Sequence, residues 1–209
     1  MRIKICGITT PEDGRMALDA GAHALGLVFY PPSARAVNVE AARAVADAVG
    51  PLVTLVGLFV DAEPEAVETV LQRVPLQLLQ FHGNESAEHC ESFGRPYIKA
   101  LRMKPELDLD AAMAAHPRAD GFLLDAYRKG VPGGTGETFD WKRVPRQAAR
   151  PVILAGGLTP NNVAHAIAAT HPYGVDVSGG VEAGPGRKDA RKVRQFIENA
   201  SNGVKGEQR

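Results

Sequence analysis

The feature that most constrains this fold is a short apolar run that recurs eight times along 209 residues. Successive runs start 21 to 31 residues apart. Most of them are too short for helices and too continuously apolar for strands with one solvated face. Strands of a parallel sheet, which is covered on both faces, have this pattern. The runs are RIKIC from Arg2, ALGLVF from Ala24, LVTLVGLFV from Leu52, LQLLQF from Leu76, YIKAL from Tyr97, GFLLD from Gly121, VILAG from Val152 and GVDVSG from Gly174.

Helical patterns lie between the runs, and two of them begin with the same signal. Thr10 and Pro11 are typical of an N-cap and a first-turn proline, and Thr159 and Pro160 repeat the pair. The segments 38–49, 63–74 and 189–197 carry apolar or alanine-rich stripes at helical spacing. Between the sixth and seventh runs, only residues 139–144 form a short helix candidate.

Strand followed by helix, eight times, predicts an α/β protein with the single-domain (β/α)8 TIM barrel fold. We expect the barrel over residues 1–199 and a frayed C-terminal tail over 200–209. An open doubly wound sheet is the alternative, because it shares the alternation. Its usual GxGxxG turn after the first strand is missing, and CGITT stands there instead.

The residue counts limit which partners and which cellular compartment we expect for this chain. Lys and Arg together number 24, as do Asp and Glu, so the charge balance indicates neither nucleic acid nor an anionic membrane as partner. No apolar run approaches the roughly 20 residues of a membrane helix, and no leader is expected. The two cysteines, Cys6 and Cys90, match no disulfide framework, zinc motif or redox motif, which favours the cytoplasm. Cys90 is expected within a helix and inert.

Glycine-rich turns follow the seventh and eighth runs. Active sites of (β/α)8 barrels lie at the C-terminal ends of the strands, and phosphate sites often use the last two loops. Glycine-rich turns expose backbone N–H groups to an anion. We therefore predict a phosphate site at Gly156, Gly157, Ser178, Gly179 and Gly180.

Other strand ends carry polar side chains whose roles the residues alone leave open. Cys6 ends the first run, where a cysteine serves either as a small core residue or as a chemical group. Arg35 is either a carboxylate clamp or a solvated loop arginine. His82 either lines a pocket or hydrogen-bonds within its own turn, and Asp176 either orients a ligand or supports the structure.

The motifs KICGIT, GLVFYPPSAR, VGLFV, LQFHG, LLD, GGTGETFDW, LAGGLTPNNV and GVDVSGGVE, in that order, resemble the phosphoribosylanthranilate isomerase family of tryptophan biosynthesis. The resemblance runs from about Ile3 to Arg191. It implies a cofactor-independent intramolecular oxidoreductase of the aldose–ketose type. Such an enzyme converts N-(5-phosphoribosyl)anthranilate to 1-(2-carboxyphenylamino)-1-deoxyribulose 5-phosphate by an Amadori rearrangement.

The resemblance also implies roles for the site residues. Cys6 is the general base and Asp125 the general acid, so the thiol must lose its proton and the carboxyl must hold one. Arg35 clamps the anthranilate carboxylate, and His82 and Asp176 are further substrate-binding residues. No metal and no cofactor are implied, and the partner is a small phosphorylated substrate bound by a monomer or homodimer. The family commonly has VSSG where this chain has VSGG, so Gly179 keeps the N–H but lacks a hydroxyl.

Two other functions remain compatible with the same loops. A pentose-phosphate epimerase would hold a metal with His82, Asp61 and Asp125, although no paired-ligand spacing supports this. A phosphate-binding module without chemistry is the non-enzymatic alternative.

Overall fold

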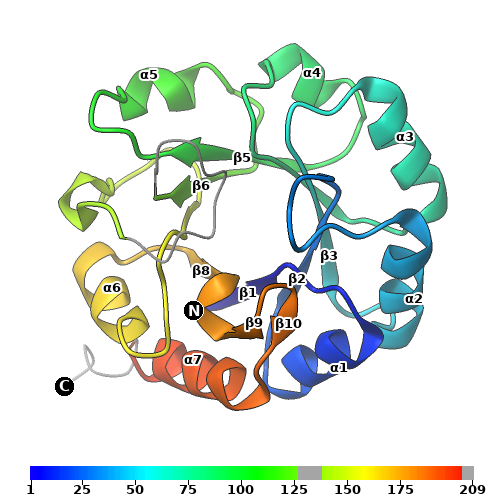
Figure 1. The fold of residues 1–209 in the computed structure, drawn as a ribbon. Helices are drawn as coiled ribbons and strands as arrows, with labels where there is room; N and C mark the ends of the chain where they lie inside the picture. The colour runs from blue at the N-terminus through cyan, green and yellow to red at the C-terminus, as the bar shows by residue number, and fades with distance from the viewer. Residues whose placement is uncertain (127–137, 204–209) are drawn as a thin grey trace.

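The computed structural model of the chain describes residues 1–126 and 138–203. Eight parallel strands form a closed barrel in chain order, and β1 pairs with both β2 and β8 (Figure 1). This closure confirms the predicted (β/α)8 barrel and excludes the open sheet. The strands are β1 Arg2–Cys6, β2 Ala24–Val28, β3 Thr54–Phe59, β4 Leu78–Phe81, β5 Tyr97–Arg102, β6 Gly121–Asp125, β7 Val152–Leu154 and β8 Gly174–Val177.

Helices surround the barrel on its outside (Figure 1). In the described part of the sixth connection, residues 138–151, the chain forms one 3-10 turn, η1, where the sequence predicts only a short helix. The structure describes η1 Trp141–Arg143 and the α-helices α1 Pro11–Asp19, α2 Val39–Val49, α3 Pro64–Arg73, α4 Ala87–Glu91, α5 Leu109–Ala114, α6 Val163–Thr170 and α7 Ala190–Asn202.

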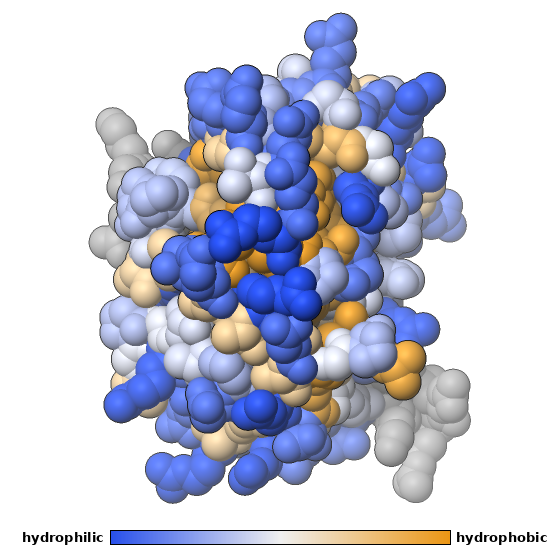
Figure 2. All heavy atoms as spheres, turned by 90° about the vertical axis from the view of Figure 1, so that its right-hand side faces the viewer, coloured by the Kyte–Doolittle hydropathy of each residue, from blue (hydrophilic) through white to orange (hydrophobic). Residues whose placement is uncertain are grey.

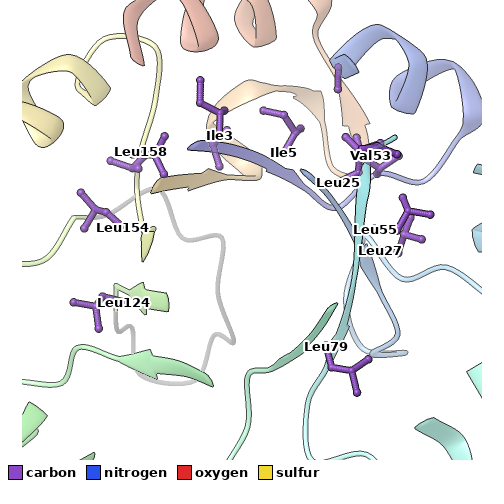
Figure 3. Packing of buried hydrophobic residues seen from close by; sticks show 14 of the residues in the cluster. Ile3, Ile5, Leu25, Leu27, Val53, Leu55, Leu79, Leu124, Leu154 and Leu158 are labelled. Carbon is purple, nitrogen blue, oxygen red and sulfur yellow. The ribbon is translucent and has the colours of Figure 1, made fainter. Parts of the chain in front are cut away.

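Side chains alternate between the two faces of each strand, and this alternation separates the core from the site. In β1, Ile3 and Ile5 belong to the large apolar cluster that includes residues of the surrounding helices. The side chains labelled in Figure 3 likewise point away from the barrel axis. Cys6 belongs to a small separate cluster instead. The inner faces of the strands are therefore free to carry polar groups.

The helix starts agree with the sequence in one case and differ in another. The Thr10 side chain accepts a hydrogen bond from the N–H of Asp13, which confirms the predicted cap of α1. The predicted cap at Thr159 is wrong, because α6 begins only at Val163. The Asn162 side chain accepts a hydrogen bond from the N–H of Thr159 at 2.8 Å, so a turn occupies residues 159–162.

After β8 the chain forms a 3-10 turn and a small hairpin that the sequence did not predict. The turn is η2 Gly179–Val181, and the antiparallel strands are β9 Glu182–Gly184 and β10 Arg187–Lys188. Helix α7 then runs to Asn202, three residues beyond the expected domain boundary at 199, and Ala200 is fully buried. Residues 204–209 of the expected tail, and most of the loop after β6 with the start of GGTGETFDW, lie outside the described residues.

The outside of the barrel is mainly polar on the face formed by α2, α3 and α4. Figure 2 shows hydrophilic side chains over most of this face, with apolar atoms visible between them. Among the described residues, no helix is both long and apolar enough to cross a membrane.

Candidate active site

A cavity of about 390 Å³ is lined by residues from the ends of most strands of the barrel. Sites for small molecules commonly measure about 300–1,000 Å³. The structure brings all ten site residues predicted from the sequence into its lining. They are Cys6, Arg35, His82, Asp125, Gly156, Gly157, Asp176, Ser178, Gly179 and Gly180.

Cys6 is at once a packed residue and a cavity residue. It is 5% exposed and clusters with Val28 and Leu58, against which Tyr30 and Val60 also pack. All five residues line the cavity and give it one apolar wall. The Cys6 side chain is therefore packed against apolar neighbours and also placed at the cavity.

Burial raises the pKa of the Cys6 thiol, and the ammonium groups of Lys4 and Lys188 act in the opposite direction. Asp176 adds to the upward shift. The positive charges that a thiolate requires are therefore present, but desolvation outweighs their effect on the pKa of the thiol.

Lys4 is a second polar residue on the inner face of β1, two positions before Cys6. Its Nζ donates to Asp176 Oδ1 on β8 at 2.9 Å, and both side chains are almost completely buried. Burial alone would lower the pKa of Lys4, but Asp176 and Cys6 raise it above its ordinary value. Asp176 thus faces a lysine, which the sequence analysis did not identify as part of the site.

Gly7 explains why a glycine follows the cysteine. Its φ is +73°, a left-handed conformation that favours glycine. A Cβ atom at this position would lie 2.7 Å from Cδ of Arg35. The absence of a side chain therefore lets the stem of Arg35 lie across the end of β1.

Arg35 is held in place by an ion pair, and its side chain is only partly exposed. Its Nε and Nη2 donate to the two carboxylate oxygens of Glu182, each at 2.8 Å. Among the described residues, Nη1 has no hydrogen-bond partner. The guanidinium is thus oriented by a bidentate pair, with one nitrogen left for a ligand.

Glu182 and Lys188, from the hairpin, complete this charged group. Lys188 Nζ donates to Glu182 Oε1 at 2.8 Å. Burial opposes the charge of Glu182, but hydrogen bonds from Arg35 and Lys188 hold its pKa below the usual value. Burial lowers the pKa of Lys188, and the contact with Glu182 limits the shift. The sequence analysis missed both residues, although GVE in the last family-like motif contains Glu182.

Asp125 ends β6 on the other side of the cavity mouth. It is 5% exposed, and its Oδ2 lies 3.1 Å from Nε2 of His82, which follows β4. Nη2 of Arg102, at the end of β5, donates to the His82 carbonyl at 3.1 Å. His82 therefore lines the pocket and hydrogen-bonds across strands to Asp125.

The glycine loops have the geometry expected of an anion site. Gly156 and Gly157 have φ of +75° and +67°. A Cβ on Gly156 would collide with the backbone N of Ala126, and one on Gly180 with the Leu158 carbonyl. Among backbone hydrogen bonds between described residues outside the helices and strands, none has the N–H of Gly156 or Gly157 as donor.

The eighth loop adds a hydroxyl and a short helical turn. Ser178 precedes η2, and its Oγ is buried without a hydrogen-bond partner among the described residues. This hydroxyl lines the cavity beside Gly179 and Gly180. Helix α6 starts too late to take part, because Asn162 and Val163 are absent from the lining.

The metal ligands of the epimerase alternative do not come together. Asp61 lies outside the cavity lining, and its carboxylate accepts hydrogen bonds from the Asn84 N–H and side chain. Within residues 1–126 and 138–203, no three His, Cys, Asp or Glu side chains form a group that could hold a metal.

Comparisons with known proteins agree with this geometry. The sequence model of the N-(5'phosphoribosyl)anthranilate (PRA) isomerase family matches residues 3–199. An N-(5'-phosphoribosyl)anthranilate isomerase of Cellvibrio japonicus is 64% identical over 197 residues, which cover 94% of this chain and 92% of the relative. One from Pseudomonas fluorescens is 60% identical over 198 residues, covering 95% and 94%.

Solved structures show the same likeness. The phosphoribosyl anthranilate isomerase of Thermotoga maritima superposes with a TM-score of 0.89 at 41% identity, over 97% of this chain and 99% of the other. A structure of such an isomerase in complex with reduced 1-(o-carboxyphenylamino)-1-deoxyribulose 5-phosphate has a TM-score of 0.85 at 39% identity, with the same coverage.

Proposed function

Because the chain belongs to the N-(5'-phosphoribosyl)anthranilate isomerase family and catalyses its Amadori rearrangement in tryptophan biosynthesis, we propose that Cys6 and Asp125 carry the two proton transfers of the reaction. The observation that supports this assignment is their position. Both line one cavity from β1 and β6, with the glycine loops after β7 and β8 between them. A substrate anchored by its phosphate at those loops reaches both groups.

In the first step Asp125 delivers its proton to the ring oxygen of the ribosyl group. The bond between that oxygen and the anomeric carbon breaks, and the nitrogen lone pair forms a Schiff base. The Cys6 thiolate then removes the proton from the neighbouring carbon, which gives an enolamine. Tautomerisation of the enolamine yields the amino ketone. The steps need one acid and one base on opposite sides of the substrate and no electron carrier.

The phosphate is assigned to the loops that follow β7 and β8. Backbone N–H groups of Gly156, Gly157, Gly179 and Gly180 offer donors without side-chain obstruction. The buried Ser178 hydroxyl supplies a further donor. Gly179 gives only its N–H at a position where the family commonly supplies a second hydroxyl.

The anthranilate group is assigned to the apolar side of the cavity. Its ring fits the apolar wall of Val28, Tyr30, Leu58 and Val60. Its carboxylate meets Nη1 of Arg35, which Glu182 keeps in place. His82 contributes through Asp125 and Asp176 through Lys4, so we assign both of them indirect roles.

The remaining expectations follow from this chemistry. The ligand is a small phosphorylated substrate, and the neutral charge balance supports no nucleic-acid partner. We propose a monomer or homodimer in the cytoplasm, whose reducing conditions keep the Cys6 thiol free.

Replacing Asp125 with Asn tests the acid directly. An amide cannot deliver the ring-opening proton, so kcat should fall by about 10²–10⁴-fold. Binding of the product, measured by fluorescence titration, should persist because the phosphate and carboxylate contacts remain. Asp110→Asn, on the exposed face of α5, is the matched control. A kcat for Asp125→Asn equal to that of Asp110→Asn would contradict the assignment.

A further inference from the structure

Gln80 is a fully buried polar residue in the middle of an apolar strand. It lies in β4, two residues before His82, so both side chains face the inside of the barrel. Leu78, two residues earlier, also faces inward and packs against the small apolar cluster that contains Ile98 and Leu123. Gln80 lines the cavity, and the acid and base roles argued above leave it without a function.

The Gln80 amide continues the contact between His82 and Asp125. Its Nε2 lies 3.1 Å from Nδ1 of His82, and Nε2 of His82 lies 3.1 Å from Oδ2 of Asp125. A neutral imidazole has one donor and one acceptor nitrogen, so the partner of Nδ1 determines what Nε2 offers to the carboxyl. The amide therefore acts on Asp125 through the ring.

The Gln80 amide can hydrogen-bond to the His82 ring in two orientations. With its NH2 toward Nδ1, the ring carries its proton on Nε2 and donates to an ionised Asp125. With its carbonyl toward Nδ1, the ring carries its proton on Nδ1, and Nε2 accepts from a protonated Asp125. Gln80 Oε1 is buried without a partner among the described residues, so no second hydrogen bond fixes the amide in one orientation.

We propose that Gln80 is a positioning residue for the acid: its amide holds the His82 ring so that Nε2 pairs with Asp125 whether or not the carboxyl carries its proton. The proposal rests on the role of Asp125 given above. An acid must keep its place before and after it gives up a proton, and an amide can match both states of the ring because its NH2 group donates and its carbonyl oxygen accepts.

Two cations near this series of hydrogen bonds come from the neighbouring strand β5. Arg102 on β5 donates to the His82 carbonyl and leaves its own Nε buried without a partner among the described residues. Lys99, also on β5, bonds instead to Glu85 and to the carbonyls of Phe81 and Gly83. Neither cation contacts the ring nitrogens of His82, so among the described residues Gln80 is the partner of Nδ1 and Asp125 the partner of Nε2.

The test compares Gln80→Met with Leu78→Met on the same inner face of β4. Methionine keeps the volume at position 80 but cannot hydrogen-bond to the ring. Loss of a group that orients a metal-binding histidine typically costs roughly 10- to 100-fold in activity, and we take the same order for a histidine that contacts the acid. We expect such a loss in kcat for Gln80→Met with KM unchanged, because the phosphate and carboxylate contacts are intact. Leu78→Met should retain wild-type kcat.

A spectroscopic readout separates positioning from packing. Two-bond ¹H–¹⁵N spectra distinguish the imidazole tautomers, and the His82 signals are assigned by their loss in His82→Gln. Gln80→Met should change the His82 ring signals, whereas Leu78→Met should leave them as in the wild type. Melting temperatures of all variants check folding, and Gln80→Leu replaces the methionine variant if that one does not fold.

The outcomes also separate this proposal from the catalytic assignment. If Asp125→Asn loses activity while Gln80→Met matches Leu78→Met in kcat and in its His82 signals, the role of Gln80 is refuted and that of Asp125 stands. If Asp125→Asn retains kcat, the acid assignment fails and the role of Gln80 fails with it.

Discussion

Lys4 and Cys6 share the inner face of β1, and the Lys4 ammonium acts to lower the pKa of the Cys6 thiol. Burial raises the thiol pKa, and the Lys4 ammonium is the largest influence that lowers it. The thiolate fraction increases as pH rises through the pKa of the thiol. The raised pKa therefore predicts that kcat/KM increases with pH above neutrality, and that any loss of positive charge moves this increase to higher pH.

Lys4→Met should accordingly raise the pKa of Cys6. The substitution removes the cation and leaves the Asp176 carboxylate unpaired beside the thiol, and both changes disfavour the thiolate. Breaking this buried ion pair should also lower the free energy of unfolding by about 3–5 kcal/mol. The pH dependence of alkylation by iodoacetamide measures the thiol, with Cys6→Ser as the blank. Cys90 contributes little, because burial raises its pKa to about 12.

The alkylation profile has a clear opposite outcome. An unchanged pH midpoint in Lys4→Met would mean that the lysine does not act on Cys6, and that the pair with Asp176 only stabilises the barrel.

At the scale of elements, we propose that the loop after β7 binds the phosphate through its backbone. Gly156→Ala should strain a residue with φ of +75° and also push against the backbone of Ala126. A displaced loop loses charge-assisted hydrogen bonds worth about 1.5–3 kcal/mol each. We therefore expect KM to rise about tenfold or more, together with a lower melting temperature.

Gly50 provides the matched control for this substitution. It has nearly the same φ, +74°, at the end of α2, and a Cβ there would meet nothing within 4 Å. Its ψ of −175° places it in a region that is essentially restricted to glycine, so Gly50→Ala should carry the cost of that backbone conformation, about 1–3 kcal/mol, and leave KM unchanged. Equal KM values in the two variants would show that the β7 loop does not bind the phosphate.

The elements were predictable where a local pattern is sufficient. The strands follow from apolar runs, and α1 follows from Thr10 and Pro11. The same pair at Thr159 and Pro160 led to a wrong prediction of the start of α6, because the Asn162 side chain closes a turn before that helix begins. Helices α4 and α5, with 5 and 6 residues, are too short to show a period. The hairpin after β8 lies in a glycine-rich segment without alternation.

The candidate site was predictable to the extent that strand ends meet at one barrel mouth. The contacts within it were not, because they join residues far apart in sequence. Lys4 and Asp176 are 172 positions apart, and Arg35 and Glu182 are 147 apart. Lys4 and Gln80 were visible as polar residues within apolar runs, at inward positions relative to Cys6 and His82. That alternation is the signal that would have identified them.

Across the whole molecule, the large apolar cluster and the residues of the candidate site lie in different layers. The large apolar cluster lies between the strands and the helices, whereas the cavity uses inward side chains and loops at one end of the barrel. Leu25, on the outer face of β2, is fully buried in that cluster (Figure 3). Leu25→Ala should therefore cost about 2–5 kcal/mol of stability and leave kcat intact below the melting temperature.

The most direct test of the account measures kcat and melting temperature together for Cys6→Ser, beside Leu25→Ala. Serine preserves the shape of the thiol but scarcely ionises at neutral pH, so it cannot accept the proton. We expect kcat to fall by at least about 10²–10⁴-fold while the melting temperature stays close to that of the wild type. A lowered melting temperature with near-normal kcat would reverse the pattern and show that Cys6 packs the barrel without taking part in catalysis.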